Sequence, residues 1–372
     1  MKILILNWRD IKNPSSGGAE ILTYEVAKRL IILGHQVIWF SSSFPNALPE
    51  EEIDGIRIIR RGKTDLRNFF GSVHFLAFRF YQKEMKGKVD VVIDEIHGIP
   101  FFTPWYVKEK KIFLICEVAD GLWIKIFGPI LGTVGQLIER FYLKFPYKNT
   151  PCLTISPSTK KDLISNGIKE SNITVLPMGV NIEKNIKVSG KERNLTLIFV
   201  GRLTVAKGIE DAIFALKEIS KKNSEVKLWI VGRGDEKYVN YLKKISHDLS
   251  IEDKITFFGY LSERKKFELL GKAHVLIHPS IKEGFGLTIP EAGFVGTPVI
   301  AYNSSGLRDI VGDNSNGILL KDKTPKSIAK EALSLFKDKN IYKKLSSGAR
   351  NEAKRYDWEN TSKIIISCLE KL

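Results

Sequence analysis

Two glutamates flank a glycine-rich segment and could bind the hydroxyl groups of a sugar. Glu283 and Glu291 are eight residues apart in KEGFGLTIPEAGFVGTP, residues 282–298. Ionised carboxylates only accept hydrogen bonds, so they suit sugar and ribose hydroxyls and disfavour phosphate. Gly284 and Gly286 would let the backbone approach a ligand closely. The residue types in this segment therefore indicate a loop that binds a sugar or a ribose.

A helix is expected to begin after Leu287, and it gives the same segment two interpretations. The free N–H groups at the start of a helix attract phosphate, which would add an anion site to the loop. Alternatively, Thr288 and Glu291 have the spacing of a capping box, with Pro290 tolerated in the first turn. In that case Glu291 would stabilise the helix and bind nothing. The spacing alone leaves both interpretations open.

Two further loops contain residues that suit a phosphate group. Arg202 and Lys207 occur in VGRLTVAKG and could converge on a diphosphate, the arginine through its planar fork and the lysine as a point charge. Gly17 and Gly18 occur in PSSGGAE, where they permit a tight turn near a phosphate. Both loops also have an interpretation without a ligand. Arg202 and Lys207 could be two solvated cations near a turn, and Gly17 and Gly18 could form an ordinary Gly-Gly turn.

Several common nucleotide-binding signatures are missing from the sequence. No G-x-G-x-x-G follows Leu6, and no G-x-x-x-x-G-K-[ST] occurs, which argues against a dinucleotide fingerprint and a P-loop. No Asp-x-Asp pair occurs either. We therefore expect no metal ion and no cofactor, because the two cations and a helix N-terminus could offset the charge of a diphosphate.

The elements that must position these loops alternate between short apolar runs and helical patterns. Runs such as LTLIFV and VKLWIV are apolar on both faces, which is typical of parallel strands covered by helices. The expected strands are Lys2–Leu6, Gln36–Ser41, Ile56–Arg60, Val89–Asp94, Ile112–Glu117, Leu153–Ser156, Thr174–Pro177, Leu195–Gly201, Val226–Gly232, Ile255–Gly259, Val275–Pro279, Pro298–Tyr302 and Gly317–Leu320. The expected helices include Ala19–Leu33, Ile209–Lys221, Glu236–Asp248, Glu263–Lys272 and Pro325–Lys337.

This alternation predicts an α/β protein with two Rossmann-like, doubly wound domains that face a cleft. The polar segment Gly179–Arg193 lacks helical periodicity and marks the boundary. We expect an N-terminal domain over 1–180 and a C-terminal domain over 190–356. The terminal segment, 357–372, has helical spacing and should pack back on the first domain.

Composition restricts the class of protein. At 372 residues, two domains are expected. The sequence lacks an apolar run long enough for a transmembrane helix, and its N-terminal apolar stretch is too short for a signal peptide. Three widely spaced cysteines indicate a reducing, cytoplasmic compartment. The net charge of +16 favours an anionic partner, unless the lysines only form a solvated surface.

Taken together, the segments resemble glycosyltransferase family 4 over essentially the whole chain. The elements GGAE, GH-V (Gly34, His35 and Val37), GRL-x-x-x-KG and EGFGL-x-x-x-EA occur in that order. The last element is specific and the first is not. The resemblance implies a GT-B fold with two Rossmann-like domains, a UDP-, GDP- or ADP-sugar as donor, and transfer with retention of anomeric configuration.

By this resemblance, the residues of the C-terminal domain receive individual roles. Arg202 and Lys207 would bind the pyrophosphate, and Glu291 would hold the ribose hydroxyls. Glu283 would touch the donor sugar and help to stabilise positive charge at its anomeric carbon.

The resemblance also assigns backbone groups. The N–H groups of Phe285, Gly286 and Leu287 would cap the distal phosphate, and Gly18 would let its loop reach the diphosphate. In the mechanism usual for the family, the acceptor hydroxyl attacks from the face that the diphosphate leaves, and a phosphate oxygen takes its proton. That mechanism needs no protein nucleophile.

The N-terminal domain departs from the family pattern at one position. Many relatives have a histidine after the strand that corresponds to KIFLI, whereas Cys116 occupies that place here. Glu117 or Asp120 could serve instead, or the sugar pocket differs. His97 follows another expected strand and could face the cleft or be structural.

Two segments mix aromatic, aliphatic and basic residues, namely Arg67–Lys83 and Leu122–Lys148. One interpretation is a surface that rests on anionic lipid at the cytoplasmic membrane face, with a glycan or polyprenyl-linked lipid as acceptor. The other is a pair of amphipathic helices whose aromatic residues belong to the core.

Three other functions are alternatives to glycosyl transfer. A sugar phosphorylase or a nucleotide-sugar epimerase with the same fold would be the nearest enzyme alternatives. A basic nucleic-acid-binding protein fits less well, because the sequence contains no helix-turn-helix or zinc-finger motif. We therefore expect no nucleic-acid partner.

Overall fold

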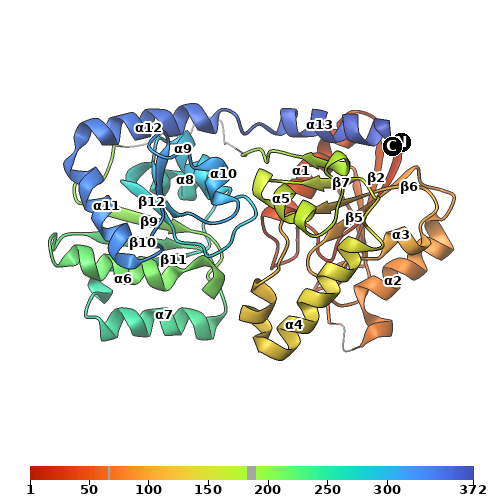
Figure 1. The fold of residues 1–372 in the computed structure, drawn as a ribbon, viewed down its shortest axis with the longest axis horizontal. Coiled ribbons are helices and arrows are strands. Elements are labelled where there is room, and N and C mark those ends of the chain that lie inside the picture. The colour runs from red at the N-terminus through yellow and green to blue at the C-terminus, as the bar shows by residue number, and fades with distance from the viewer. Residues whose placement is uncertain (66–67, 182–189) are drawn as a thin grey trace. The chain divides into compact units, whose positions relative to one another are not determined.

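The computed structural model describes residues 1–65, 68–181 and 190–372, and the chain divides into two compact units (Figure 1). Unit 1 consists of Met1–Gly179 and Trp358–Leu372, and unit 2 consists of Val180–Asp357. Most of the predicted boundary segment, residues 182–189, lies outside the described residues, as does Arg67 at the start of a predicted amphipathic segment.

Unit 1 is built on an eight-stranded sheet with the order β3-β4-β2-β1-β5-β6-β7-β8. The strands are β1 (Lys2–Leu6), β2 (Gln36–Ser41), β3 (Glu50–Ile53), β4 (Ile56–Arg60), β5 (Val91–Ile96), β6 (Lys110–Ile115), β7 (Cys152–Thr154) and β8 (Ile173–Val175). All neighbouring pairs are parallel except β3 with β4. The central strands are buried along nearly their whole length, as their apolar runs predict.

The edge strand β3 was not expected from the sequence. It contains three consecutive glutamates and pairs antiparallel with β4. The turn between the two strands is Asp54–Gly55, and both residues have positive φ, of 49° and 79°. An Asp-Gly pair of this kind suits a two-residue hairpin. The turn could therefore have been predicted from the Asp-Gly pair, but the charged strand beside it could not.

Helices cover both faces of this sheet (Figure 1). They are α1 (Gly18–Ile32), α2 (Val73–Phe80), α3 (Thr103–Tyr106), α4 (Leu122–Lys144), α5 (Pro157–Ser165) and α13 (Trp358–Lys371), with short turns η1 (Phe69–Gly71), η2 (Tyr81–Met85) and η3 (Glu170–Asn172). The terminal helix α13 packs against α1, where Arg29 Nε lies 2.9 Å from Glu359 Oε1. The last residues of the chain therefore belong to unit 1.

Unit 2 contains a six-stranded parallel sheet with the order β11-β10-β9-β12-β13-β14. Its strands are β9 (Thr196–Val200), β10 (Lys227–Val231), β11 (Ile255–Gly259), β12 (Val275–His278), β13 (Val299–Tyr302) and β14 (Gly317–Leu320). Its helices are α6 (Ile209–Ser220), α7 (Glu236–Asp248), α8 (Glu263–Lys272), α9 (Thr288–Phe294), α10 (Leu307–Ile310), α11 (Pro325–Lys337) and α12 (Lys339–Ala353), with turns η4 (Val205–Lys207) and η5 (Glu252–Lys254).

The strand order of unit 2 reverses direction between β9 and β12, which are adjacent in the sheet. In doubly wound sheets, ligands bind beyond the carboxyl ends of the strands at such a switch point. The loops that follow β9 and β12 are the segments with Arg202, Lys207 and Glu283. The topology therefore places the sequence-predicted residues of unit 2 at one edge of one sheet.

Among the described residues, none of the helices is both long enough and apolar enough to span a membrane.

Candidate functional site

The loops after β9 and β12 lie against each other at the switch point of unit 2. The Ile281 N–H donates to the Ala206 carbonyl at 3.1 Å. Gly208 has a φ of +66°, and a Cβ there would lie 2.3 Å from the Pro279 carbonyl oxygen. Only glycine permits this approach, so the VAKG turn and the loop after β12 are held together by their backbones.

Lys207 and Glu283 meet where these two loops join. The Lys207 ammonium donates to Glu283 Oε2, and both side chains are mostly buried. His278 Nε2 lies 3.8 Å from the same carboxylate oxygen. Burial by itself raises the pKa of Glu283, but Lys207, His278 and Arg202 lower it more, so the pKa is below its ordinary value. Glu283 is therefore an ionised carboxylate whose charge is stabilised by two cations, Lys207 and Arg202.

His278 ends β12 and was not selected from the sequence. Its side chain is buried, and Nδ1 lies 3.1 Å from the Ser280 hydroxyl. Burial lowers the pKa of His278 to about 4, although Glu283 opposes this shift. The imidazole is therefore neutral at physiological pH. A histidine at the end of an apolar strand, directly before the glycine-rich loop, was the available signal.

The glycine-rich loop has a narrowly defined path. Gly286 has a φ of +93°, and a Cβ there would lie 2.9 Å from the Leu307 side chain. A Cβ at Gly306 would lie 2.2 Å from the Glu283 carbonyl oxygen. The buried Phe285 ring packs edge-on against Tyr356, at 5.5 Å between centroids. Leu307 of α10 and the preceding Gly306 pack against one side of the loop, and Tyr356 packs against Phe285. These contacts fix the backbone of Glu283 and Gly284.

Glu291 is not part of a capping box. Helix α9 begins after Leu287, which makes no side-chain capping bond. Within the described residues, Thr288 Oγ1 and Glu291 Oε2 are buried and lack hydrogen-bond partners. Glu291 Oε1 instead accepts from Lys266 Nζ at 2.8 Å. The capping interpretation of this pair is therefore wrong, and both polar atoms are left without partners among the described residues.

In unit 1, the two glycines of GGAE lie at the start of α1. Gly17 is the N-cap residue, and its N–H donates to Glu20 Oε2 at 2.7 Å. Glu20 Oε1 accepts from Arg9 Nε at 3.0 Å. Gly18 is the first helical residue and is exposed. The turn is thus held by a buried glutamate from its own motif.

His97 follows β5 and lies at the carboxyl edge of the sheet of unit 1. Its ring stacks on Trp8, at 5.8 Å between centroids, and Nε2 lies 3.7 Å from Glu95 Oε2. Glu95 is buried and accepts hydrogen bonds from Asn7 and Thr23. Burial raises the pKa of Glu95. Sequence reasoning missed this carboxyl, although an acidic pair inside an apolar strand was a visible signal.

Cys116 and Asp120 have different surroundings in the structure. Cys116 directly follows β6, and burial raises the pKa of its thiol well above the ordinary value, with Glu95, Glu117 and Glu20 raising it further. Cys116 is therefore a neutral thiol, and it experiences the charge of Glu95, the carboxyl beside His97. The Asp120 carboxylate instead accepts from Gln136 Nε2 at 2.5 Å and lies 3.3 Å from Arg140 Nη2. Asp120 thus bonds to α4.

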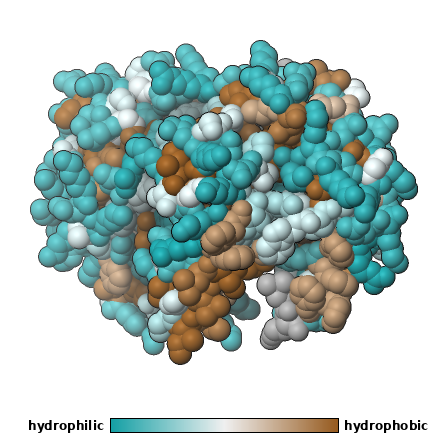
Figure 2. Space-filling model, turned by 45° about the vertical axis from the view of Figure 1, so that its right-hand side comes forward, coloured by the Kyte–Doolittle hydropathy of each residue, from teal (hydrophilic) through white to brown (hydrophobic). Residues whose placement is uncertain are grey.

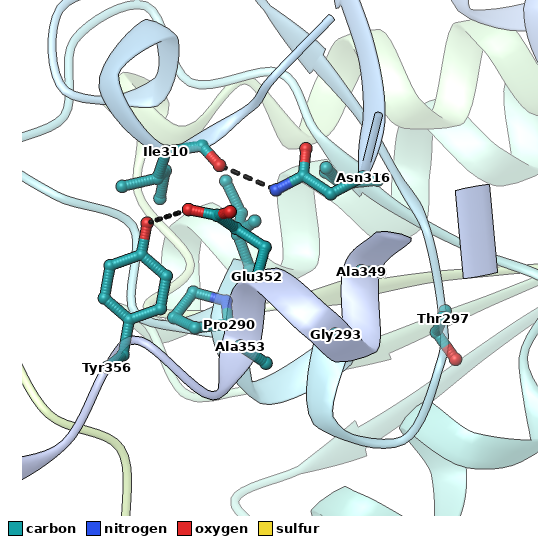
Figure 3. A pocket seen from close by; sticks show the side chains of 11 residues that line it. Pro290, Gly293, Thr297, Ile310, Asn316, Ala349, Glu352, Ala353 and Tyr356 are labelled. Carbon is teal, nitrogen blue, oxygen red and sulfur yellow. Dashed lines mark hydrogen bonds between the residues drawn. The ribbon is translucent and has the colours of Figure 1, made fainter. Parts of the chain in front are cut away.

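A small cavity lies between α9 and α12 (Figure 3). Its volume of about 10 Å³ is enough for a single water at most. The lining residues are Ile289, Pro290, Gly293, Thr297, Val299, Ile310, Asn316, Ala349, Glu352, Ala353 and Tyr356. Asn316 Nδ2 donates to the Ile310 carbonyl at 2.8 Å, as Figure 3 shows. The cavity is a packing space and is too small for a substrate.

The described residues contain no group of three or more His, Cys, Asp or Glu side chains that could hold a metal ion.

Two family profiles match the chain, and together they span residues 16–352. "Glycosyltransferase Family 4" matches residues 16–184, and "Glycosyl transferases group 1" matches residues 181–352. An uncharacterised glycosyltransferase of Methanocaldococcus jannaschii is 27% identical over 390 residues, covering 99% of this chain and 97% of the relative.

Solved structures share the fold. Sucrose-phosphate synthase from Thermosynechococcus elongatus superimposes with a TM-score of 0.81 at 17% identity, covering 100% of this chain and 98% of that one. The Anabaena protein HepE, in complex with UDP-glucose, gives a TM-score of 0.78 at 17% identity and covers 100% of both chains. The family expected from the motifs is confirmed: this chain is an enzyme with the GT-B fold and belongs to the glycosyltransferases of the group 1 and family 4 type.

Proposed function

We propose that this glycosyltransferase moves a hexose-type sugar from a nucleotide diphosphate sugar to a glycan or lipid-linked acceptor, with retention of anomeric configuration. The observation that carries the proposal is the arrangement at the switch point of unit 2. Lys207 and Arg202 act on Glu283 there, while Thr288 Oγ1 and Glu291 Oε2 lack partners among the described residues. Cations beside acceptors for hydroxyl groups suit a molecule with both a diphosphate and sugar rings.

Each residue has a definite role in this proposal. Arg202 and Lys207 bind the diphosphate and stabilise its charge as it leaves. Glu291 accepts hydrogen bonds from the ribose. Glu283 faces the donor sugar and stabilises positive charge at the anomeric carbon. The N–H groups of Phe285, Gly286 and Leu287 lie in the same loop and approach the distal phosphate.

The proposed reaction takes place on one face of the sugar. The bond between the anomeric carbon and the diphosphate oxygen breaks, and the acceptor oxygen bonds to the anomeric carbon from the same side. The acceptor proton passes to the leaving diphosphate. The protein positions the reactants and stabilises charge, which are the large contributions available without a protein nucleophile.

The nucleotide is proposed to be a uridine diphosphate. The support is the complex of the Anabaena protein HepE with UDP-glucose, a structure that this fold resembles over its full length. Similarity of fold does not fix specificity, so the experiment described next also includes GDP and ADP sugars.

A thermal-shift screen with UDP, GDP, ADP and their hexose conjugates tests the donor proposal. A ligand at 100 times its dissociation constant adds about 2.7 kcal/mol to stability, which is readily measured. We expect a shift with one nucleotide series in the wild type and a strongly reduced shift in Glu291→Ala. No shift with any nucleotide or conjugate would refute the donor proposal. NMR of the product anomer then tests retention, and inversion would refute the single-face reaction.

Activity in the presence of EDTA tests the expectation that no metal ion is required. In this proposal Arg202 and Lys207 supply the positive charge that Mg²⁺ supplies elsewhere. Transfer should therefore persist in EDTA, with added Mg²⁺ as the matched condition. Loss of transfer in EDTA and its recovery with Mg²⁺ would contradict the assignment of these two residues as sufficient counter-charge.

We further propose that the acceptor is lipid-linked and that α4 docks on an anionic membrane. The support begins with the shape of α4, which breaks at Gly128, where φ is 78° and ψ is 175°, before Pro129. A Cβ at Gly132 would lie 2.4 Å from Ile124 Cα, and a Cβ at Gly135 would lie 2.6 Å from the Trp123 ring. The first part of α4 therefore folds back on the second, and only glycine permits this.

The break in α4 leaves apolar side chains in solvent. Ile130 and Leu131 are 80% and 68% exposed, and Ile126 and Phe127 beside them are exposed as well. In Figure 2, apolar side chains gather at the lower edge of unit 1, over α4. An exposed apolar patch of this kind usually marks an interaction surface. The alternative expectation, that the aromatic residues of this segment belong to the core, holds for Tyr142 and Tyr147 but not for the exposed Phe127, Phe141 and Phe145.

Basic residues on the same helix favour an anionic lipid surface as the partner. Lys125, Arg140, Lys144 and Lys148 are exposed on α4 or directly after it. Each such residue near an anionic leaflet contributes about 1 kcal/mol to binding. Together with the net charge of +16, this pattern supports peripheral docking on the cytoplasmic face.

Co-sedimentation with vesicles tests the docking proposal. Wild type should pellet with vesicles that contain phosphatidylglycerol at low salt, and less with neutral vesicles. The double variant Ile130→Asp and Leu131→Asp should remain in the supernatant. Ile32→Asp is the matched control, because Ile32 is 79% exposed on α1, away from this patch in the sequence. Equal pelleting of all three proteins would rule the proposal out.

A further inference from the structure

Lys266 is the least exposed member of a run of basic residues on α8. Its side chain is 12% exposed, whereas the neighbouring Lys265 is 52% exposed. Its ammonium lies 2.8 Å from Glu291 Oε1, and 2.9 and 2.8 Å from the two carboxylate oxygens of Glu263. An ammonium group has three donors, so these contacts use its full capacity.

Lys266 occupies only one of the two oxygens of Glu291. The other oxygen, Oε2, is buried and lacks a partner among the described residues, and so does the neighbouring Thr288 Oγ1. Leaving buried polar atoms unpaired is unfavourable, so their presence in a preformed loop points to a ligand that completes them. The geometry thus leaves one Glu291 oxygen free while the other is held.

We propose that Lys266 is a positioning residue of the donor site, which holds the Glu291 carboxylate so that it accepts hydrogen bonds from the ribose hydroxyls of the nucleotide. This role rests on the proposed function. Lys266 acts through Glu291 and has no assigned contact with the donor. It also explains why a buried lysine is present on a helix where the two preceding cations, Arg264 and Lys265, are solvated.

Electrostatics supports the same role. Burial raises the pKa of Glu291, Lys266 opposes that shift, and Glu263 adds to it. Burial lowers the pKa of Lys266, but Glu291 and Glu263 raise it more, so the ammonium stays charged. Without Lys266, the pKa of Glu291 would rise further, and a larger fraction of the carboxyl would be protonated as the pH falls.

Helix α12 packs against α9 as well and brings its own charged groups. Arg350 donates to the Val295 carbonyl at 3.1 Å, and Glu352 lies 3.2 Å from Arg355. These groups are therefore engaged elsewhere. The pH dependence of Glu291 is expected to follow from Lys266 and Glu263.

Nucleotide binding measured by calorimetry tests the inference. UDP and 2′,3′-dideoxy-UDP are titrated into wild type, Lys266→Met, Lys266→Arg and Lys265→Met between pH 5.5 and 8. Lys266→Met should bind UDP about tenfold more weakly at pH 7.5, the effect of one charge-assisted hydrogen bond, and still more weakly at lower pH. Lys266→Arg should recover most of the affinity, and Lys265→Met should match the wild type.

The dideoxy nucleotide separates positioning from a general loss of structure. It has no ribose hydroxyls, so wild type and Lys266→Met should bind it equally. Equal affinity of both proteins for UDP, or the same loss with both nucleotides, would overturn the role of Lys266. If Lys266→Met does not fold, Glu291→Gln provides the second variant, because it keeps the shape and removes the charge.

Failure of the proposed function gives a different pattern. If the wild type binds neither UDP, GDP nor ADP, the donor site itself is refuted, and the role of Lys266 falls with it. If the wild type binds a nucleotide and only the dependence on Lys266 is missing, the donor site stands and the positioning role alone is overturned.

Discussion

Replacing Gly306 with alanine should displace the loop that contains Glu283. Gly306 has a φ of +79°, and a Cβ there would lie 2.2 Å from the Glu283 carbonyl oxygen and 2.7 Å from the Gly284 carbonyl oxygen. Ordinary contacts of a Cβ begin near 3.4 Å, so the loop must move by about 1 Å. A misplacement of about 1 Å can cost 10²-fold in rate, and we expect a loss of about that size in kcat/KM.

The matched control is Gly259→Ala, in the same unit. Gly259 also has a positive φ, of +67°, but a Cβ there would meet nothing within 4 Å. Both variants should lose about 1–2 kcal/mol of stability from the strained backbone, and urea unfolding measures this. Only Gly306→Ala should lose transfer activity and nucleotide affinity. If the two variants have the same activity, packing of Gly306 against the loop does not position Glu283.

Three further predictions concern binding, burial and pH. Glu291→Ala should bind the donor nucleotide about 10²-fold more weakly in calorimetry, with stability changed by under about 1 kcal/mol; near-normal turnover would remove it from the site. Arg60→Met leaves the buried Asp10 without its bidentate partner and should cost about 3–5 kcal/mol in urea unfolding, against under 1 kcal/mol for the exposed Arg57→Met, and equal losses would contradict this. Burial lowers the pKa of His278 from 6.5 to about 4, so the free energy of unfolding should fall as the pH drops through that window. His278→Gln should reduce the slope of the free energy of unfolding against pH by the equivalent of about one proton, and an unchanged slope would refute this prediction.

The strands of both sheets could be predicted from the sequence, because strands that are buried on both faces consist of nearly continuous apolar residues. The strands Gln36–Ser41, Ile255–Gly259 and Gly317–Leu320 were expected with the bounds that they have. Two others, β5 and β6, were expected with bounds shifted by two residues, because polar residues at a strand end carry little periodicity. The hairpin strand β3 was missed because its glutamates lie at an edge of the sheet, where charge is tolerated.

The candidate site was only partly predictable from the sequence. Loops with glycines and paired charges after apolar strands identified Lys207 and Glu283, which the structure brings into contact. Lys266 gave no signal, because its sequence context, ERKKFELL, is that of an ordinary solvated helix. Its burial arises only when α8 packs beside α9. Pairings across elements of this kind are set by tertiary structure and leave no local pattern.

The charges of unit 2 suggest that the two site glutamates would respond differently when a donor enters. In the structure each site glutamate has a lysine, Glu283 with Lys207 and Glu291 with Lys266. A diphosphate that draws Lys207 toward itself would free Glu283 to face the sugar ring. Lys266 is already held by Glu263, so Glu291 can take up ribose hydroxyls without losing its counter-ion. Binding would therefore move Lys207 from one anion to another, and the positive charge that develops at the anomeric carbon would take its place beside Glu283, whereas Glu291 keeps its lysine throughout.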